Sequence, residues 1–391
     1  MALDVDEPLD RMVLLANPGA SPADKILALA GGQHQDILAK LEDQQAATMV
    51  KAWGQARKET AERMERIWAQ TFGMGVTPEP KDVIAWSQSA QLLSGLDQRL
   101  DDLGITTQAL QGQAWSTGAE LGWLQANKER GFAVTDFGGA AMVGKSVFGN
   151  LPSLGYDLAM TAAINETKNL STMLRASLHQ ELIAGGTQGE GIKQLRRRLD
   201  KVLGGATANG NNRAELIARW STIKGHNAAR DQTLNDAAQS IPGLSKMWLV
   251  QRDERTCPHC MAHWGEVVPA DAEFDKERSF AGTPQKVYGD VLETPPLHPR
   301  CRCTITAWHE RWRGLSSFTP EDYQEQAQVA AQEVGFTKGP KHFPPPKPPK
   351  GLRTTRAGRR VINAQNISQI PESVREATKD KLVSCWLGGT A

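Results

Sequence analysis

Two short stretches decide how this chain is organised: DERTCPHC, from Asp253 to Cys260, and PPLHPRCRC, from Pro295 to Cys303. Together they hold four of the five cysteines in a chain of 391 residues. A Cys-x-x-Cys turn directs two thiolates to one point, and a second turn of similar spacing can complete the tetrahedral shell that Zn²⁺ prefers. The spacing therefore predicts a structural zinc site.

The first stretch supplies Cys257 and Cys260 as the expected metal ligands, and two more must come from His298, Cys301 and Cys303. His298 and Cys301 repeat the spacing of the first pair and rank first, with Cys303 as the alternative to His298. A shell filled by four protein ligands has no position for water. We therefore expect a structural ion, with no catalytic residue and no organic cofactor.

Two polar residues beside the first turn, Asp253 and Thr256, are expected to hydrogen-bond its free backbone amides and so fix the direction of the thiolates. The competing interpretation is that the cysteines are only small buried hydrophobic residues. Four thiols in two turns favour the metal site.

Short β-prone runs surround the cysteines at 247–252, 266–268 and 304–308. So small a sheet buries too little apolar area to be stable alone, and a bound metal ion would supply the missing stability. Most of the remaining sequence has the three-to-four-residue periodicity of helices. We therefore predict a mainly α fold, with long helices in a bundle, then a small α+β zinc-stapled module and an extended Pro-rich basic tail.

The expected helices cover a long segment that ends at Gly73–Pro78, then about 81–103, 106–129, 158–184, 192–203, 213–239 and 319–334. Glycine clusters and the change of period divide the chain into six predicted segments. They are an N-terminal helical region (1–131), a Gly-rich linker (132–156), a helical part (157–244), the zinc-binding β module (245–312), a helix (313–336) and a Pro-rich basic tail with a weak terminal helix (337–391).

The tail from Lys338 to Arg360 is rich in proline and contains basic but no acidic residues. Such a segment stays extended, and its cations can contact DNA phosphates without reading sequence. The alternative is a solvated linker without a partner. The candidate DNA contacts are Lys338, Lys341, Lys347, Lys350, Arg353, Arg356, Arg359 and Arg360.

Composition excludes several classes of protein. The formal net charge of +1 gives no global field that would recruit nucleic acid or a membrane. No apolar run reaches the roughly 20 residues of a membrane span. The odd number of cysteines and an acidic start without an apolar stretch argue against a secreted disulfide framework and favour synthesis in a reducing cytoplasm.

The paired pattern D-E-R-T-C-x-x-C and P-P-x-H-P-x-C-R-C, together with Asn227, Trp248 and Gly265–Val268, resembles the phage Mu F-like head morphogenesis family. These are minor head proteins of tailed phages, and the resemblance covers about 158–308. It implies a non-enzymatic virion protein of the capsid interior or portal vertex, made in the cytoplasm of the host bacterium. Its implied partners are the portal protein and the capsid interior, with oligomerisation in the virion and a role in DNA ejection.

Two other functions also fit paired cysteine turns. An HNH-like nuclease needs a His general base beside an acid and a catalytic metal, whereas His298 is flanked by Leu297 and Pro299. A zinc-dependent nucleic-acid-binding module would use the arginines around the turns, namely Arg255, Arg300 and Arg302.

Overall fold

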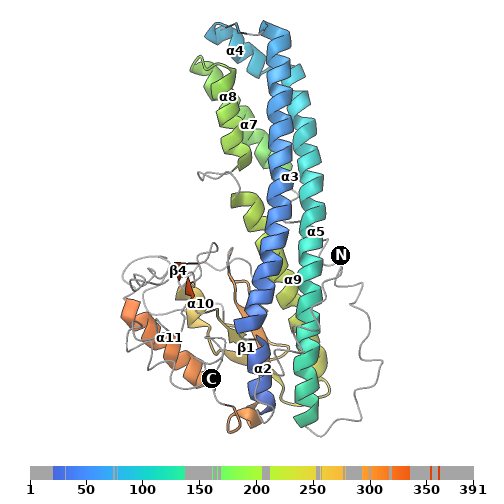
Figure 1. The fold of residues 1–391 in the computed structure, drawn as a ribbon, viewed down its shortest axis with the longest axis vertical. Helices are drawn as coiled ribbons and strands as arrows, with labels where there is room; N and C mark the ends of the chain where they lie inside the picture. The colour runs from blue at the N-terminus through green and yellow to red at the C-terminus, as the bar shows by residue number, and fades with distance from the viewer. Residues whose placement is uncertain are drawn as a thin grey trace. The chain divides into compact units, whose positions relative to one another are not determined.

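The computed structural model describes residues 21–30, 32–73, 75–76, 78–136, 161, 165, 169–204, 212–251, 256, 258–275, 278, 293–298, 301–316, 319–334, 353–354 and 360–361. These residues are mostly helical and include a small three-stranded sheet, which confirms the predicted fold class (Figure 1). No helix among them is both long and apolar enough to cross a membrane.

The chain forms two compact units. The helical unit comprises Ala39–Glu120 and Asn150–His226, and the sheet unit comprises Met1–Leu38, Leu121–Gly149 and Asn227–Ala391. The division between the units falls inside three long helices: α3 (Gly32–Phe72), α5 (Ala90–Asp136) and α9 (Asn212–Ala238). The six-segment division predicted from the sequence stays a prediction.

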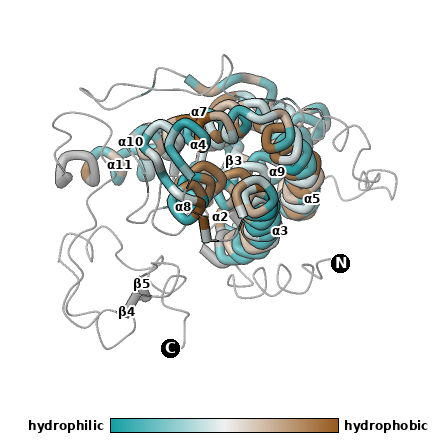
Figure 2. The backbone as a smooth tube through the Cα atoms, turned by 90° about the horizontal axis from the view of Figure 1, so that it is seen from above, coloured by the Kyte–Doolittle hydropathy of each residue, from teal (hydrophilic) through white to brown (hydrophobic). Residues whose placement is uncertain are grey.

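Besides its parts of α3, α5 and α9, the helical unit contains α4 (Pro80–Ser87), α7 (Leu170–Thr187) and α8 (Ile192–Gly204). Leucines recur every four residues along α7 and α8, which places them on one face of each helix. These faces are buried in a common core, whose leucines on the two helices are Leu174, Leu178, Leu182, Leu195, Leu199 and Leu203. Figure 2 shows hydrophobic stretches interspersed with hydrophilic ones along these helices.

The sequence prediction of two helices at 81–103 and 106–129 was wrong at this point. The structure has a short α4 and then one helix, α5, that continues through Gly104. Gly104 is buried, and a Cβ at this position would lie 3.5 Å from the Cβ of Ser171. That distance is an ordinary van der Waals contact, so Gly104 lies inside a packed helix and does not end one. The actual helix start lies earlier, where the Ser89 hydroxyl accepts a hydrogen bond from the Leu92 amide at 3.3 Å.

Two other glycines allow α5 and α9 to touch backbone to backbone in the helical unit. A Cβ on Gly118 would lie 2.1 Å from the carbonyl oxygen of Thr222, and a Cβ on Gly225 would lie 2.1 Å from that of Trp115. Real Cβ contacts are never this short, so any side chain here would force the two helices apart.

The sheet unit is built on three antiparallel strands in the order β2-β1-β3. They are β1 (Ser245–Leu249), β2 (Val267–Pro269) and β3 (Thr304–Trp308), close to the three predicted strands. Besides its parts of α3, α5 and α9, the unit contains α2 (Pro22–Ala30), α10 (Pro258–Ala262), η2 (Glu310–Trp312) and α11 (Pro320–Val334). Helix α2 lies against β3, and α10 lies against α11. Two-residue strands β4 (Arg353–Thr354) and β5 (Arg360–Val361) also pair.

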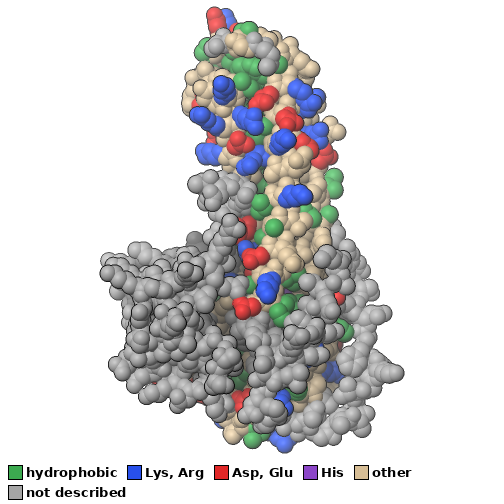
Figure 3. Space-filling view, in the orientation of Figure 1, with side chains coloured by type: hydrophobic (Ala, Val, Ile, Leu, Met, Phe, Trp, Pro, Cys, Tyr) green, Lys and Arg blue, Asp and Glu red, His purple; other side chains and the backbone are tan. Residues whose placement is uncertain are grey.

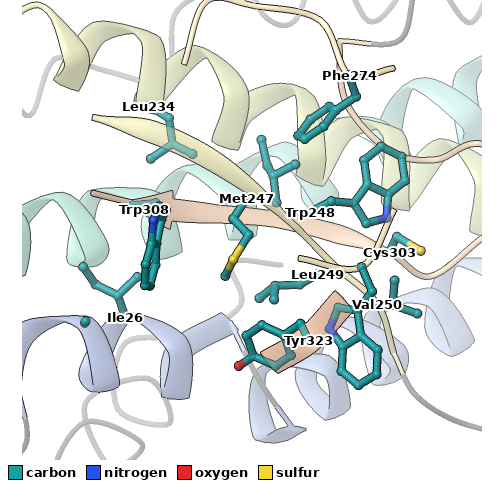
Figure 4. Close-up of a cluster of buried hydrophobic side chains, with 14 of the residues drawn as sticks. Ile26, Leu234, Met247, Trp248, Leu249, Val250, Phe274, Cys303, Trp308 and Tyr323 are labelled. Carbon is teal, nitrogen blue, oxygen red and sulfur yellow. The ribbon is translucent and has the colours of Figure 1, made fainter. Parts of the chain in front are cut away.

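The central strand β1 is buried on both faces, so Met247, Trp248 and Leu249 pack into the core of the sheet unit (Figure 4). The edge of the Phe274 ring meets the Trp248 indole, with centroids 5.0 Å apart. Trp308 of β3 and Trp312 are fully buried as well. Large aromatic side chains thus supply much of the apolar area in a sheet of short strands.

The outer edge of β3 is covered by polar side chains of the helices. The Arg230 guanidinium donates to the Ile305 carbonyl at 2.7 Å and to Glu129 at 2.7 Å, and both side chains are completely buried. Glu129 in turn accepts from the Ala307 amide at 3.3 Å and from the Thr306 hydroxyl at 3.3 Å. An exposed strand edge would offer these groups to another chain, and here the ion pair satisfies them.

Candidate metal centre

Three of the predicted ligands converge in the sheet unit. Cys260 lies on α10, while His298 and Cys301 lie in the segment that leads into β3. The Cys260 Sγ is 3.2 Å from the His298 Nε2 and 3.6 Å from the Cys301 Sγ. All three ligand atoms lie within 4.8 Å of one another, so within the described residues this group could hold a metal ion.

These distances match the dimensions of a tetrahedral thiolate–imidazole site. With a metal–sulfur bond of about 2.3 Å and a metal–nitrogen bond of about 2.0 Å, ligand atoms are separated by about 3.8 Å for two sulfurs and by about 3.5 Å for sulfur and nitrogen. A disulfide would instead join two sulfurs at about 2.0 Å. Cys260 and Cys301 are free thiols, so the group fits a bound cation.

A tight turn sets the direction of the second pair. The Cys301 amide donates to the His298 carbonyl at 3.0 Å, which brings these two side chains to the same side of the chain. On the other segment, the His263 amide donates to the Cys260 carbonyl at 3.1 Å and closes the end of α10. Two local turns, far apart in sequence, therefore present their ligands to one point.

Cys303 also belongs to this neighbourhood. Its thiol is buried beside the thiols of Cys260 and Cys301, and its sulfur lies near the Trp248 indole (Figure 4). The Cys303 carbonyl accepts a hydrogen bond from the Asn227 side chain at 3.0 Å, and the Thr304 hydroxyl donates to Asn227 at 2.9 Å. Asn227 of α9 thus holds the ligand-bearing segment in place.

The pKa values of the Cys301 and Cys303 thiols are shifted in opposite directions. Burial raises the pKa of Cys301, but hydrogen bonds with Cys260 and Cys303 and the charge of His298 outweigh it, so this pKa lies well below its ordinary value. Burial raises the pKa of Cys303 well above its ordinary value, and the neighbouring Cys301 thiolate adds to the effect. Without a cation, one thiol of the pair keeps its proton, whereas a bound cation would stabilise both thiolates.

Two predicted residues of the first stretch, Cys257 and Asp253, lie outside the described residues. The Thr256 hydroxyl donates to the Gln251 carbonyl, and its predicted contact with the backbone amides of the turn stays a prediction. The basic tail also lies outside the described residues, except for the backbone of β4 and β5, and so does the predicted terminal helix.

The neighbouring histidines have other surroundings. The His263 Nδ1 lies 2.6 Å from the Glu266 carboxylate, and its ring stacks on Trp248 with centroids 4.7 Å apart. His309 contacts the Pro242 carbonyl through Nε2 at 3.1 Å. His259 is buried beside Cys260. None of these three histidines belongs to the group whose ligand atoms converge.

Of the arginines that pointed to nucleic-acid binding, Arg255 and Arg300 lie outside the described residues. Arg302 is half-buried and donates to the Gln251 side chain at 3.3 Å. This contact joins the two cysteine-bearing segments.

Sequence reasoning missed two pairs that support the site. Glu266 follows His263 by three residues across a turn, and that spacing could have suggested the contact. Glu129 and Arg230 are separated by 101 positions, and no local pattern relates them. The arginine–glutamate pair therefore becomes visible only when the chain is folded.

The family model described as Phage Mu protein F like protein matches residues 176–306. This segment contains Asn227, the three converging ligands and Cys303. The match confirms, for these residues, the resemblance inferred from the paired cysteine motif. No curated protein and no solved structure matches the chain.

Proposed function

We propose that this chain, with its Phage Mu protein F like segment at 176–306, is a minor head protein of a tailed phage and carries one structural zinc ion. The observation that carries the proposal is the family match, because the matched segment contains the converging side chains of Cys260, His298 and Cys301. The protein acts by assembly and not by catalysis.

Zinc is the cation that suits these donors. Thiolates and imidazole together select Zn²⁺ over Mg²⁺ or Ca²⁺, which prefer oxygen ligands. The fourth ligand is a further thiol, and both Cys257 and Cys303 are candidates. Cys257 directly precedes α10 and completes a Cys-x-x-Cys turn, whereas Cys303 contacts the thiols of Cys260 and Cys301. The ion would then join α10 to the segment before β3.

Two single variants distinguish the fourth ligand. If Cys257 binds the ion, Cys257→Ser lowers zinc affinity and Cys303→Ser keeps one zinc per chain; if Cys303 binds it, the results are reversed. Affinity is measured by competition with a chromogenic chelator. Cys385→Ser is the matched control because this cysteine lies outside both motifs. Full affinity in both variants would contradict a fourth thiol ligand.

The surface of the helical unit supports an assembly role over DNA binding by its helices. Acidic and basic side chains intermingle on the face shown in Figure 3. In α8, Arg196 pairs with Glu65 at 2.8 Å, and Arg198 pairs with Glu181 and Glu190, each at 2.6 Å. These pairs engage two of the arginines of α8, which makes this helix a weaker candidate for DNA contact than the tail.

The proposed location is the capsid interior or the portal vertex, with the portal protein as partner and a role in DNA ejection. The test is co-purification of the tagged full chain with the portal protein from the same genome, together with mass spectrometry of purified virions. We expect co-purification and a few copies of the chain per virion. A chain that is absent from virions and does not bind the portal would contradict the proposal.

One observation favours a nuclease as the second candidate function. The His263 imidazole, 2.6 Å from Glu266, resembles a general base oriented by an acid. Its ring is completely buried, however, and Nε2 has no hydrogen-bond partner among the described residues. We expect the purified chain with Mg²⁺ or Mn²⁺ to leave plasmid DNA intact. Nicking that disappears in His263→Ala would establish the nuclease.

A further inference from the structure

The central strand of the sheet unit buries a lysine. The Lys246 side chain is only 1% exposed, and its Nζ lies 2.6 Å from the Oδ1 of Asp231 on α9, whose side chain is 13% exposed. A lysine is almost never buried so completely unless it is paired. Among the described residues, Asp231 is the only hydrogen-bond partner of this ammonium group. Two opposite charges are thus withdrawn from water and held against each other.

Aromatic side chains border this pair. The Lys246 Nζ lies 5.6 Å from the centroid of the Phe274 ring, and the edge of this ring meets the Trp248 indole (Figure 4). Burial raises the pKa of Asp231 above its ordinary value although the hydrogen bond from Lys246 lowers it, and the charge of Glu293 raises it further. The uncharged acid is therefore more favoured at this position than at a carboxyl group in water.

The second carboxylate oxygen of Asp231 has a partner of its own. The Asn235 Nδ2, one turn further along α9, donates to the Asp231 Oδ2 at 3.3 Å. Lys246 therefore contacts one oxygen while Asn235 contacts the other, which fixes the orientation of the carboxyl group between them. An amide donor at Oδ2 also stabilises the negative charge that develops on this oxygen when a nucleophile attacks Cγ.

We propose that the side chains of Lys246 and Asp231 join in an intramolecular isopeptide bond. A proton moves from the ammonium to the Oδ1 of the carboxylate along their contact, which leaves an uncharged amine beside an uncharged acid. The amine Nζ then attacks Cγ, so that an Nζ–Cγ bond forms and the bond from Cγ to Oδ1 breaks. Oδ1 leaves as water with two protons from the nitrogen, and Oδ2 becomes the amide oxygen. This condensation changes no oxidation state and needs no further reactant.

Position and burial both favour the reaction. Two groups that a fold holds in contact react as if their effective concentration were on the order of 10⁵ M or more. The amide also replaces two buried charges, whose removal from water costs free energy. The linked residues are 15 positions apart, on either side of the connection from α9 to β1. The bond would therefore close this connection covalently and tie the long helix to the central strand.

Mass spectrometry of the purified full chain in denaturant tests the proposal. An ion pair dissociates there and leaves the full mass, whereas the isopeptide bond lowers the mass by about 18 Da, the mass of one water. Digestion with trypsin locates the loss. Trypsin does not cleave after a lysine whose amine is acylated, so the fragment that contains both linked residues should continue past Lys246 to Arg252. A wild type of full mass, or one that trypsin cleaves after Lys246, overturns the proposal.

Variants identify the reacting groups. Lys246→Arg keeps the positive charge but should show no loss of water, because a guanidinium stays protonated and cannot attack the acid. Asp231→Ala should show none either. Lys201→Arg is the matched control, because Lys201 forms an exposed pair with Glu181 at 3.3 Å, and this variant should keep the loss. Loss of water that persists in Lys246→Arg or in Asp231→Ala overturns the proposal, and the wild-type digest gives its result whether or not these variants fold.

Discussion

The helical unit and the sheet unit are stabilised in different ways. The helical unit buries rows of leucines from α7 and α8, and each row can be read from a four-residue repeat. The three-stranded sheet of the sheet unit has strands of three to five residues, and the unit buries thiols, a histidine–glutamate pair and an arginine–glutamate pair. We expect apolar burial to be the main source of stability in the first, whereas in the second we expect polar contacts between distant segments and the proposed metal ion to contribute as well.

Removal of the metal should produce the largest difference in stability between the two units. Structural zinc supplies about 10 kcal/mol or more of folding free energy at neutral pH. Chelation should therefore abolish amide protection in β1, β2 and β3, while α7 and α8 keep theirs. Hydrogen exchange with mass spectrometry measures both units in one sample. Equal loss of protection in both units would contradict the proposed difference.

The buried ion pair should have the next largest effect. Glu129→Ala leaves the Arg230 guanidinium charged and unpaired in the core, which we expect to lower the free energy of unfolding by about 3–5 kcal/mol. Urea denaturation followed by tryptophan fluorescence measures the change.

The double variant Glu129→Leu with Arg230→Met removes both charges and should lose less stability than Glu129→Ala alone. Glu120→Ala, at an exposed position of the same helix, should change stability little. If Glu129→Ala proved as stable as Glu120→Ala, the ion pair would not stabilise the β3 edge.

A variant at the crossing of α5 and α9 tests whether close packing stabilises the helical unit. Gly225→Ala places a Cβ against the Trp115 carbonyl oxygen and should destabilise the chain by about 1–3 kcal/mol. Gly54→Ala is the matched control, because nothing lies within 4 Å of its Cβ position. It should stabilise α3 by about 0.5–1 kcal/mol. Thermal unfolding should show a lower midpoint temperature than the wild type for Gly225→Ala and a higher one for Gly54→Ala.

The smallest effect concerns the ion pairs of α8. Hydrogen bonds from Arg198 lower the pKa of Glu181 and of Glu190 below the ordinary value of 4.5, despite partial burial. Because the folded-state pKa values are lowered, this stabilisation is present above pH 4.5 and is lost as the pH falls through them. Arg198→Met should cost about 1 kcal/mol at pH 7 and less at pH 3. If the stability lost in Arg198→Met did not change with pH, the ion pairs with Glu181 and Glu190 would not be its source.

The sequence predicted features that repeat locally. Helical periodicity between glycine- and proline-rich breaks predicted α8 and α9, and β-prone runs predicted all three strands of the main sheet. The helix break expected near Gly104 was wrong, because a glycine inside a long packed helix cannot be told from one that ends a helix by its residue type alone. The arginine–glutamate pair beside β3 was not predictable, since its partners are joined only by the fold.

For the candidate site, the spacing of the cysteines predicted that the side chains of Cys260, His298 and Cys301 converge. It did not predict the supports around them. Asn227 stood out as part of a resemblance, and its contact with the Cys303 carbonyl gives a physical reason for its presence.

The central claim is that one zinc ion joins α10 to the segment before β3. Metal analysis of the purified full chain tests it most directly, by comparing the wild type with the double variant Cys260→Ser with Cys301→Ser. The account predicts about one zinc per chain in the wild type and none in the variant. A wild type without zinc, or a variant that keeps it, would contradict the account.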